Sequence, residues 1–148
     1  MSTTERIRMV AVGPDDTAEK AQWLEALGNA IDSNSFCLGG EVDRYESACK
    51  ERLGVAHALC VSSGTDGLKV ALSAVGVTSG EVIVPAYSFF STASVIVQMG
   101  AVPIFCDLDP ETLCIDPVAA ETLISSRTRA ILPVHLYGQT ADMDALLK

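Results

Sequence analysis

The amino-acid sequence predicts an α/β domain with a mostly parallel sheet and helices on both faces. Short apolar segments at residues 81–84, 102–106 and 129–134 alternate with longer segments in which apolar residues recur every three or four positions. Strands that alternate with helices form βαβ units, in which neighbouring strands run parallel. A further apolar segment at residues 58–62 predicts one more strand at the start of this series.

Two amphipathic helices are expected before the first strand. Asp16 is placed to cap the first helix, with Glu19 three residues later, and apolar residues then follow at helical spacing up to Ile31. The second helix follows a glycine pair at residues 39–40. We expect it to end at Gly54, because glycine is common just after a helix C-terminus.

The helices within the alternating series have candidate inner faces and candidate caps. Asp116 and Pro117 predict one helix start, as N-cap and first residue, and Thr140 predicts another. The expected inner faces are Leu68, Ala71, Leu72 and Val75 in one helix, and Phe90, Ala93, Ser94 and Val97 in the next.

Composition limits the function. The chain has 148 residues, of which 49% are hydrophobic, enough for one domain with a core. Its net charge of −9 argues against nucleic acid or anionic membrane as the main partner, because both select a basic protein surface. No apolar run reaches the length that spans a bilayer, and residues 1–12 lack the apolar centre of a signal peptide. We therefore expect a cytoplasmic protein.

The five cysteines form no C-x-x-C pair, and only two histidines accompany them. This spacing predicts no metal site. We expect reduced thiols, most of them buried as small hydrophobic residues.

The most informative segment runs from Cys60 to Leu68, where a predicted strand turns into a predicted helix through small residues. A helix N-terminus has unpaired N–H groups and a partial positive charge, and can therefore bind a phosphate. Gly64 would allow close approach of the backbone, while Ser63 and Thr65 would add hydroxyl donors. The alternative is an ordinary helix cap, for which serine and threonine are equally suited.

Five segments together resemble the N-terminal part of a known enzyme family. They are Leu38-Gly39-Gly40-Glu41-Val42, VSSGTDGLKVAL at residues 61–72, VIVPAYSFFSTA at 82–93, GAVPIFCDLDPETLCID at 100–116 and PVHLYGQTADMDAL at 133–146. In order and spacing these runs resemble the DegT/StrS family of sugar aminotransferases. The resemblance implies the large domain of the aspartate-aminotransferase (type I) fold and the cofactor pyridoxal 5'-phosphate.

The resemblance also implies cofactor-binding residues. The turn that contains Gly64, Thr65 and Asp66 would hold the cofactor phosphate, and Phe89 would lie against the face of the pyridine ring. Simple core packing is the alternative for Phe89. If the alignment with the family were shifted by one position, the role of Phe89 would pass to a neighbouring aromatic residue, Tyr87 or Phe90.

By the same resemblance, the expected reaction moves an amino group from glutamate or glutamine to a nucleotide-linked keto sugar, in a homodimer. The family's Schiff-base lysine and the aspartate that pairs with the ring nitrogen lie beyond residue 148, so no catalytic residue can be named and this chain alone is expected to be inactive. We interpret residues 1–15 as a loose segment and 16–148 as a truncated cofactor-binding large domain. A sugar dehydratase of the same family and a non-catalytic binding or regulatory remnant remain the alternatives.

Several other polar residues are weaker candidates. Lys69 is expected to be a surface charge, and His135 a hydrogen-bonded structural residue rather than a functional one. Asp107 and Asp109 resemble a carboxylate pair, but the sequence from Asp109 to Thr112 favours a turn. Dinucleotide and nucleoside-triphosphate sites are excluded, because neither G-x-G-x-x-G nor G-x-x-x-x-G-K-[ST] occurs.

Overall fold

The computed structural model describes residues 13–14, 16–34 and 36–148, so the loose segment predicted for residues 1–15 lies almost entirely outside the described residues. The chain divides into two compact units, Met1–Cys60 and Val61–Lys148. Among the described residues we find no helix with both the length and the apolar character that a bilayer crossing requires.

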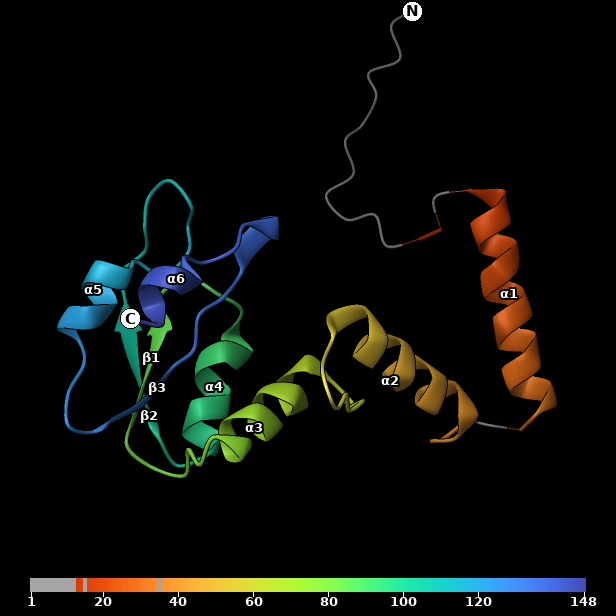
Figure 1. The fold of residues 1–148 in the computed structure, drawn as a ribbon, viewed down its shortest axis with the longest axis horizontal. Coiled ribbons are helices and arrows are strands. Elements are labelled where there is room, and N and C mark those ends of the chain that lie inside the picture. The colour runs from red at the N-terminus through yellow and green to blue at the C-terminus, as the bar shows by residue number, and fades with distance from the viewer. Residues whose placement is uncertain (1–12, 15, 35) are drawn as a thin grey trace, which may run out of the picture. The chain divides into compact units, whose positions relative to one another are not determined.

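The first unit contains the two predicted helices, α1 (Thr17–Asp32) and α2 (Gly40–Leu53) (Figure 1). The Asp16 carboxylate accepts a hydrogen bond of 2.8 Å from the backbone N–H of Glu19, which confirms the cap. Gly54 has a φ of 64°, the left-handed conformation expected after a helix C-terminus. Neither helix has a buried residue within the described part of the chain.

The prediction of a strand at residues 58–62 is wrong. The segment is irregular, and the backbone N–H of Cys60 donates 2.7 Å to the Glu46 carboxylate of α2 instead of to a neighbouring strand. A strand exists only through its hydrogen bonds to an adjacent strand. Apolar composition alone therefore does not produce one here.

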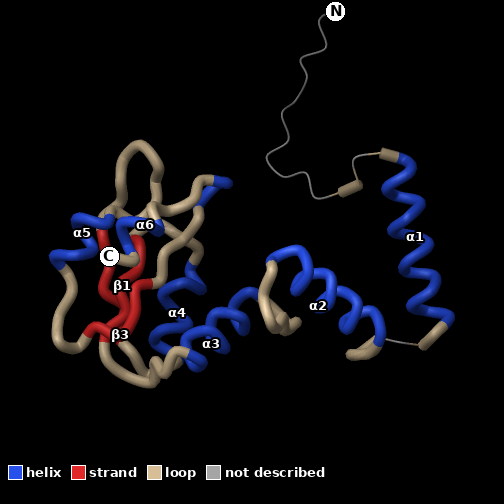
Figure 2. Tube along the Cα trace, in the orientation of Figure 1, coloured by secondary structure: helices blue, strands red, loops and turns tan. Residues whose placement is uncertain are grey.

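The second unit is built around a three-stranded parallel sheet, drawn in red in Figure 2. Its strands are β1 (Glu81–Pro85), β2 (Val102–Cys106) and β3 (Thr128–Ile131), in the spatial order β2-β1-β3. All three predicted strands are confirmed, although β3 ends three residues earlier than expected. The remaining elements are α3 (Gly64–Ala74), α4 (Phe90–Gln98), α5 (Pro117–Thr122), the 3-10 turn η1 (Leu136–Gly138) and α6 (Met143–Leu146).

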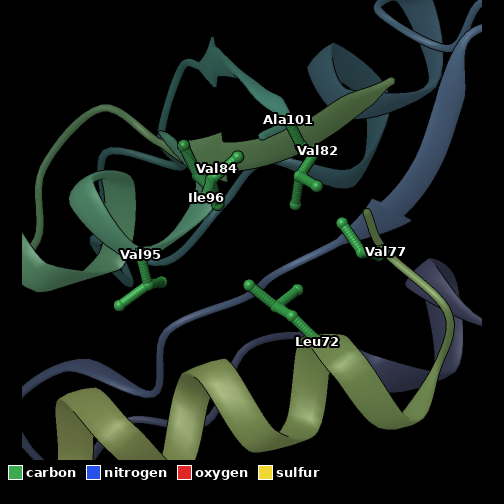
Figure 3. Close-up of a cluster of buried hydrophobic side chains, with 7 residues drawn as sticks. All are labelled: Leu72, Val77, Val82, Val84, Val95, Ile96 and Ala101. Carbon is green, nitrogen blue, oxygen red and sulfur yellow. The ribbon is translucent and has the colours of Figure 1, made fainter. Parts of the chain in front are cut away.

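Helices cover both faces of the sheet, as the sequence predicts. Successive residues of a strand point to opposite faces, so Val82 and Val84 of β1 pack against α3 and α4 (Figure 3). Ile83, between them, packs in a second cluster with Ala120 of α5 and with α6. The central strand is buried along its whole length because both of its faces are covered.

The buried face of α4 differs from the prediction. Thr92, Val95 and Ile96 are buried, whereas Phe90 and Val97 are exposed. The helix carries no charged residue, and its buried face includes the polar Thr92, so the apolar periodicity did not identify its inner face. In α3 the prediction holds for Leu72 and Leu68, which pack in the core, but Ala71 and Val75 are exposed.

The predicted cap of α5 is confirmed, and that of α6 is wrong. Asp116 accepts 2.9 Å from the backbone N–H of Val118, and Pro117 is the first residue of α5. At α6 the capping residue is Asp142 rather than Thr140, with a hydrogen bond of 2.9 Å from the N–H of Ala145. Asp142 lies immediately before the helix, where its carboxylate reaches the free N–H groups.

Candidate functional site

The candidate site lies at the carboxyl edge of the sheet, which we define by the last residues of the three strands, Pro85, Cys106 and Ile131. Helix α4 begins at this edge, shortly after β1 ends. Helix α3 packs beside α4. Both helices end near the amino edge of the sheet, where the strands begin at Glu81, Val102 and Thr128 (Figure 1). Since its eleven residues span about 16 Å, α3 returns its N-terminus toward the carboxyl edge. The turn before α3 and the loop after β1 thus precede two helices that pack together, and we take both as the candidate site.

A network of short side chains fixes the start of α3. Ser63 is the N-cap, and its hydroxyl accepts 3.2 Å from the backbone N–H of Asp66 while donating 3.0 Å to the Asp66 carboxylate. Ser62 donates to the same carboxylate oxygen. Serine and an acidic residue three positions later thus satisfy each other in the manner of a capping box. The cap interpretation of Ser63 is confirmed.

The Asp66 carboxylate is held in its charged form. Hydrogen bonds from the two serines, and then from Lys69, lower the pKa of Asp66. The Lys69 ammonium lies 3.4 Å from the second carboxylate oxygen and offsets its charge. Lys69 is partly exposed and paired on the surface, as the sequence predicts for a solvated charge.

Three donors at the start of α3 have no hydrogen-bond partner among the described residues. Within the described residues no hydrogen bond is made by the backbone N–H of Gly64, by that of Thr65 or by the Thr65 hydroxyl. A Cβ built on Gly64 would meet no atom within 4 Å, so the space beside it is open. These donors, the open space and the positive end of the helix fit the phosphate of pyridoxal phosphate.

Phe89 lies outside the core that the described residues form. Its side chain is 78% exposed in this part of the protein. It occupies the N-cap position of α4, where its side chain makes no capping hydrogen bond. An exposed aromatic face at the carboxyl edge has the form needed to cover a flat ring.

Further aromatic residues lie beside Phe89, and one was not predicted. Tyr87 and Phe90 are exposed, and the Tyr87 hydroxyl lies 3.0 Å from that of Tyr137, which follows β3. Tyr137 belongs to the matching run at 133–146, but no role was predicted for it. The sequence feature that could have identified it is its position, an aromatic residue shortly after a predicted strand, because ligands of such folds bind beyond the carboxyl ends of the strands.

The remaining polar candidates are structural. The His135 Nδ1 atom accepts 3.1 Å from the backbone N–H of Ala141, as expected for a structural histidine. Asp109 accepts hydrogen bonds of 2.9 and 2.8 Å from the N–H groups of Glu111 and Thr112, which confirms the turn. Asp107 accepts 3.1 Å from the N–H of Leu108.

The next question is whether the described cysteines and acidic residues could bind a metal ion. Among the described residues we find no group of three or more His, Cys, Asp and Glu that could hold an ion. All five thiols are free, but only Cys106 and Cys114 are buried, so the expectation that most are buried is wrong.

Comparison with known proteins gives the identity of the family. Residues 17–148 match the model of the DegT/DnrJ/EryC1/StrS aminotransferase family. The chain belongs to this family. Its members depend on pyridoxal phosphate and adopt the type I fold, which confirms the cofactor and the fold class that the resemblance implied.

Three relatives show how far the similarity extends. The chain is 44% identical to an L-glutamine:2-deoxy-scyllo-inosose aminotransferase of Streptomyces lividus, with 82% of this chain and 31% of that protein covered. It is 36% identical to the UDP-N-acetyl-3-dehydro-alpha-D-glucosamine 3-aminotransferase of Acidithiobacillus ferrooxidans, over 99% of this chain and 40% of that protein. The crystal structure of NtdA from Bacillus subtilis with bound PMP superposes with a TM-score of 0.85 and 34% identity, and covers 98% of this chain and 34% of NtdA. The chain therefore spans about a third of the length of the relatives it matches.

Proposed function

We propose that this chain is the cofactor-binding part of an aminotransferase that moves an amino group from glutamine or glutamate to the keto group of a sugar or cyclitol. The observation that supports this most directly is the set of unpaired donors at the start of α3, which shares the carboxyl edge with the exposed Phe89 ring. Family membership adds the pyridoxal-phosphate chemistry, and the relatives add the keto substrate.

Each proposed site residue has a separate task. The backbone N–H groups of Gly64 and Thr65, with the Thr65 hydroxyl, bind the phosphate. Asp66 holds Ser62 and Ser63 in place and so keeps the turn in its binding form. Phe89 covers one face of the cofactor ring. When bound, pyridoxal phosphate supplies an electron sink for the breaking of a bond at the amino-acid α-carbon.

The remaining parts of the reaction are proposed to come from outside these 148 residues. A lysine that holds the cofactor covalently and a carboxylate that keeps its ring nitrogen protonated are needed for this chemistry. We propose that residues 16–148 are one part of a larger cofactor-binding domain, that the active protein is a homodimer, and that its acceptor is linked to a nucleotide. The UDP-sugar relative supports the last point, and the inosose relative is the reason to test a free cyclitol as well.

The test uses protein expressed from the intact gene and loaded with pyridoxal phosphate. Glutamine or glutamate alone should convert the cofactor to its amino form, seen as a change in its visible absorbance. A UDP-linked 3-keto sugar and 2-deoxy-scyllo-inosose are then added separately, and mass spectrometry measures the amino product. Absence of cofactor conversion by any amino donor would overturn the proposal. The chain of residues 1–148 alone should transfer no amino group to either acceptor.

A further inference from the structure

Four of the eight aromatic residues of this chain gather at the carboxyl edge of the sheet. Tyr87, Phe89 and Phe90 follow β1, and Tyr137 follows β3. Their exposed fractions are 52%, 78%, 79% and 78%. These side chains do not build the core, and only Phe89 has a task in the proposed function.

Tyr87 and Tyr137 form a pair across two loops. They are fifty positions apart in sequence, and their hydroxyl oxygens lie 3.0 Å apart because β1 and β3 are neighbours in the sheet. Tyr87 stands two residues before Phe89. The pair is therefore positioned next to the ring that we propose covers the cofactor.

The backbone of Tyr137 is strained, and burial does not compensate for the strain. Its φ of 52° and ψ of 32° are left-handed, a conformation that costs a non-glycine residue about 1–2 kcal/mol. A side chain that remains mostly exposed gains little from packing. Strain of this kind accumulates at binding and catalytic sites, where it presents a side chain to a ligand.

The hydrogen-bonding capacity of the pair fits a neutral ligand. Phenols are protonated at neutral pH because their ordinary pKa is about 10, and the hydrogen bond with Tyr87 raises the pKa of Tyr137 further. One hydroxyl proton is shared between the oxygens, which leaves one donor and several lone pairs for a ligand. The two loops, residues 85–92 and 132–141, contain no Lys, Arg, Asp or Glu. Carboxylates and phosphates would find no charged partner there.

We propose that the Tyr87–Tyr137 pair binds the hydroxyl groups of the amino acceptor's ring, a neutral polyhydroxylated six-membered ring. This inference rests on the proposed function, since it places the ring beside the cofactor that Phe89 covers. The phenol hydroxyls exchange hydrogen bonds with ring hydroxyls. The aromatic faces contact the ring's C–H groups, as amphipathic tyrosine is suited to do.

The test replaces each hydroxyl separately in the cofactor-loaded protein from the intact gene. Tyr87→Phe and Tyr137→Phe keep the rings and remove one hydroxyl each. Tyr45→Phe, at an exposed position of α2, is the matched control. The probe is myo-inositol, and its binding is measured calorimetrically. Conversion of the cofactor by glutamine is measured in the same preparations.

Each pair variant should weaken myo-inositol binding about twofold to tenfold, the effect of one lost neutral hydrogen bond. The double variant should lose less than the product of the two single effects, because both hydroxyls belong to one network. Tyr45→Phe should bind myo-inositol as the wild type does, and urea unfolding of the pair variants should stay cooperative, which a general loss of structure would not allow.

The inference is overturned if wild-type protein does not bind myo-inositol, or if the pair variants bind it as well as Tyr45→Phe does. Failure of the proposed function has a different signature, namely no cofactor conversion by any amino donor in the wild type. The two results are thus distinguishable.

Discussion

The two edges of the sheet differ in how their polar groups are satisfied. At the amino edge, Glu81 is 7% exposed, and its carboxylate accepts 2.7 Å from the Ser125 hydroxyl and 2.8 Å from Arg127 Nε. At the carboxyl edge, the donors of Gly64 and Thr65 have no partner among the described residues. The amino edge is closed by its own side chains, whereas at the carboxyl edge the described structure leaves donors unpaired and aromatic faces exposed. Stability and binding can therefore be changed separately.

The amino edge is also where the backbone packs most tightly. Gly80 precedes β1 with a φ of 86°, and a Cβ at this position would lie 2.7 Å from the Arg127 carbonyl oxygen. The loops before β1 and β3 therefore approach each other closely. Only glycine fits there.

The largest expected effect comes from Gly80→Ala. The added methyl group would clash with backbone and require left-handed φ from alanine, so we expect a loss of about 3 kcal/mol in the free energy of unfolding. Urea denaturation of the protein measures it. Gly76→Ala is the control, because Gly76 has a similar φ of 77° but no atom within 4 Å of the added Cβ. The control should lose only about 1–2 kcal/mol. Equal losses would mean that the close approach at the amino edge has no energetic consequence.

At the carboxyl edge, Thr65→Val should weaken cofactor binding about tenfold to a hundredfold. The substitution keeps the shape and removes one hydroxyl donor to a charged acceptor, worth about 1.5–3 kcal/mol. Titration with pyridoxal phosphate, followed by absorbance, measures the affinity. Unfolding should be unchanged, because the hydroxyl has no partner in the described protein.

Ser63→Ala should change stability more than cofactor affinity, the reverse of Thr65→Val. Loss of the cap lowers the free energy of unfolding by about 1 kcal/mol. Its effect on cofactor affinity should be smaller than that of Thr65→Val. If the two variants changed both properties alike, Thr65 would be part of the cap and not of a binding site.

A smaller effect is expected for Phe89→Leu. Loss of the aromatic face should weaken cofactor binding about twofold to tenfold, the equivalent of about 0.5–1.5 kcal/mol for an aromatic contact. Phe90→Leu is the matched control, since Phe90 is the next residue and equally exposed. The same titration compares both variants. A loss confined to Phe90→Leu would assign the ring-covering role to Phe90 and contradict the alignment proposed for Phe89.

Local features of both edges could be predicted from the sequence, and long-range features could not. The capping turn at Ser63 depends on residues within three positions of each other, so its pattern is visible in the sequence. The Tyr87–Tyr137 pair depends on the order of the strands. The sequence predicts a parallel sheet but does not say that β1 lies between β2 and β3, and so the pair was missed.

The errors in predicting the fold have the same origin. Residues 58–62 have the composition of a strand but no partner strand in the structure. Helix α4 has no charged residue to mark its outer face, and the face that meets the sheet includes the polar Thr92. In both cases tertiary contacts decide what local pattern leaves undetermined.

The smallest expected effect is the pH dependence of the amino edge. Hydrogen bonds from Ser125, and then from Arg127, lower the pKa of Glu81 below the ordinary value of a glutamate. The native state therefore binds this proton less readily than the unfolded chain does. Its contribution to stability is complete above the unfolded pKa, about 4.3, and is lost as the pH falls through the lower native pKa.

The effect is limited because the Arg127 side chain is 75% exposed and solvent screens its charge. Glu81→Gln keeps the shape and removes the charge, so it isolates this group from Asp66 and Asp109, whose pKa values are also lowered. Wild type should be more stable than Glu81→Gln at pH 7, and the difference should shrink steadily below the unfolded pKa. Urea unfolding over this pH range measures it. A difference that stays constant with pH would mean that Glu81 supports the amino edge by shape and neutral hydrogen bonds, and not by its charge.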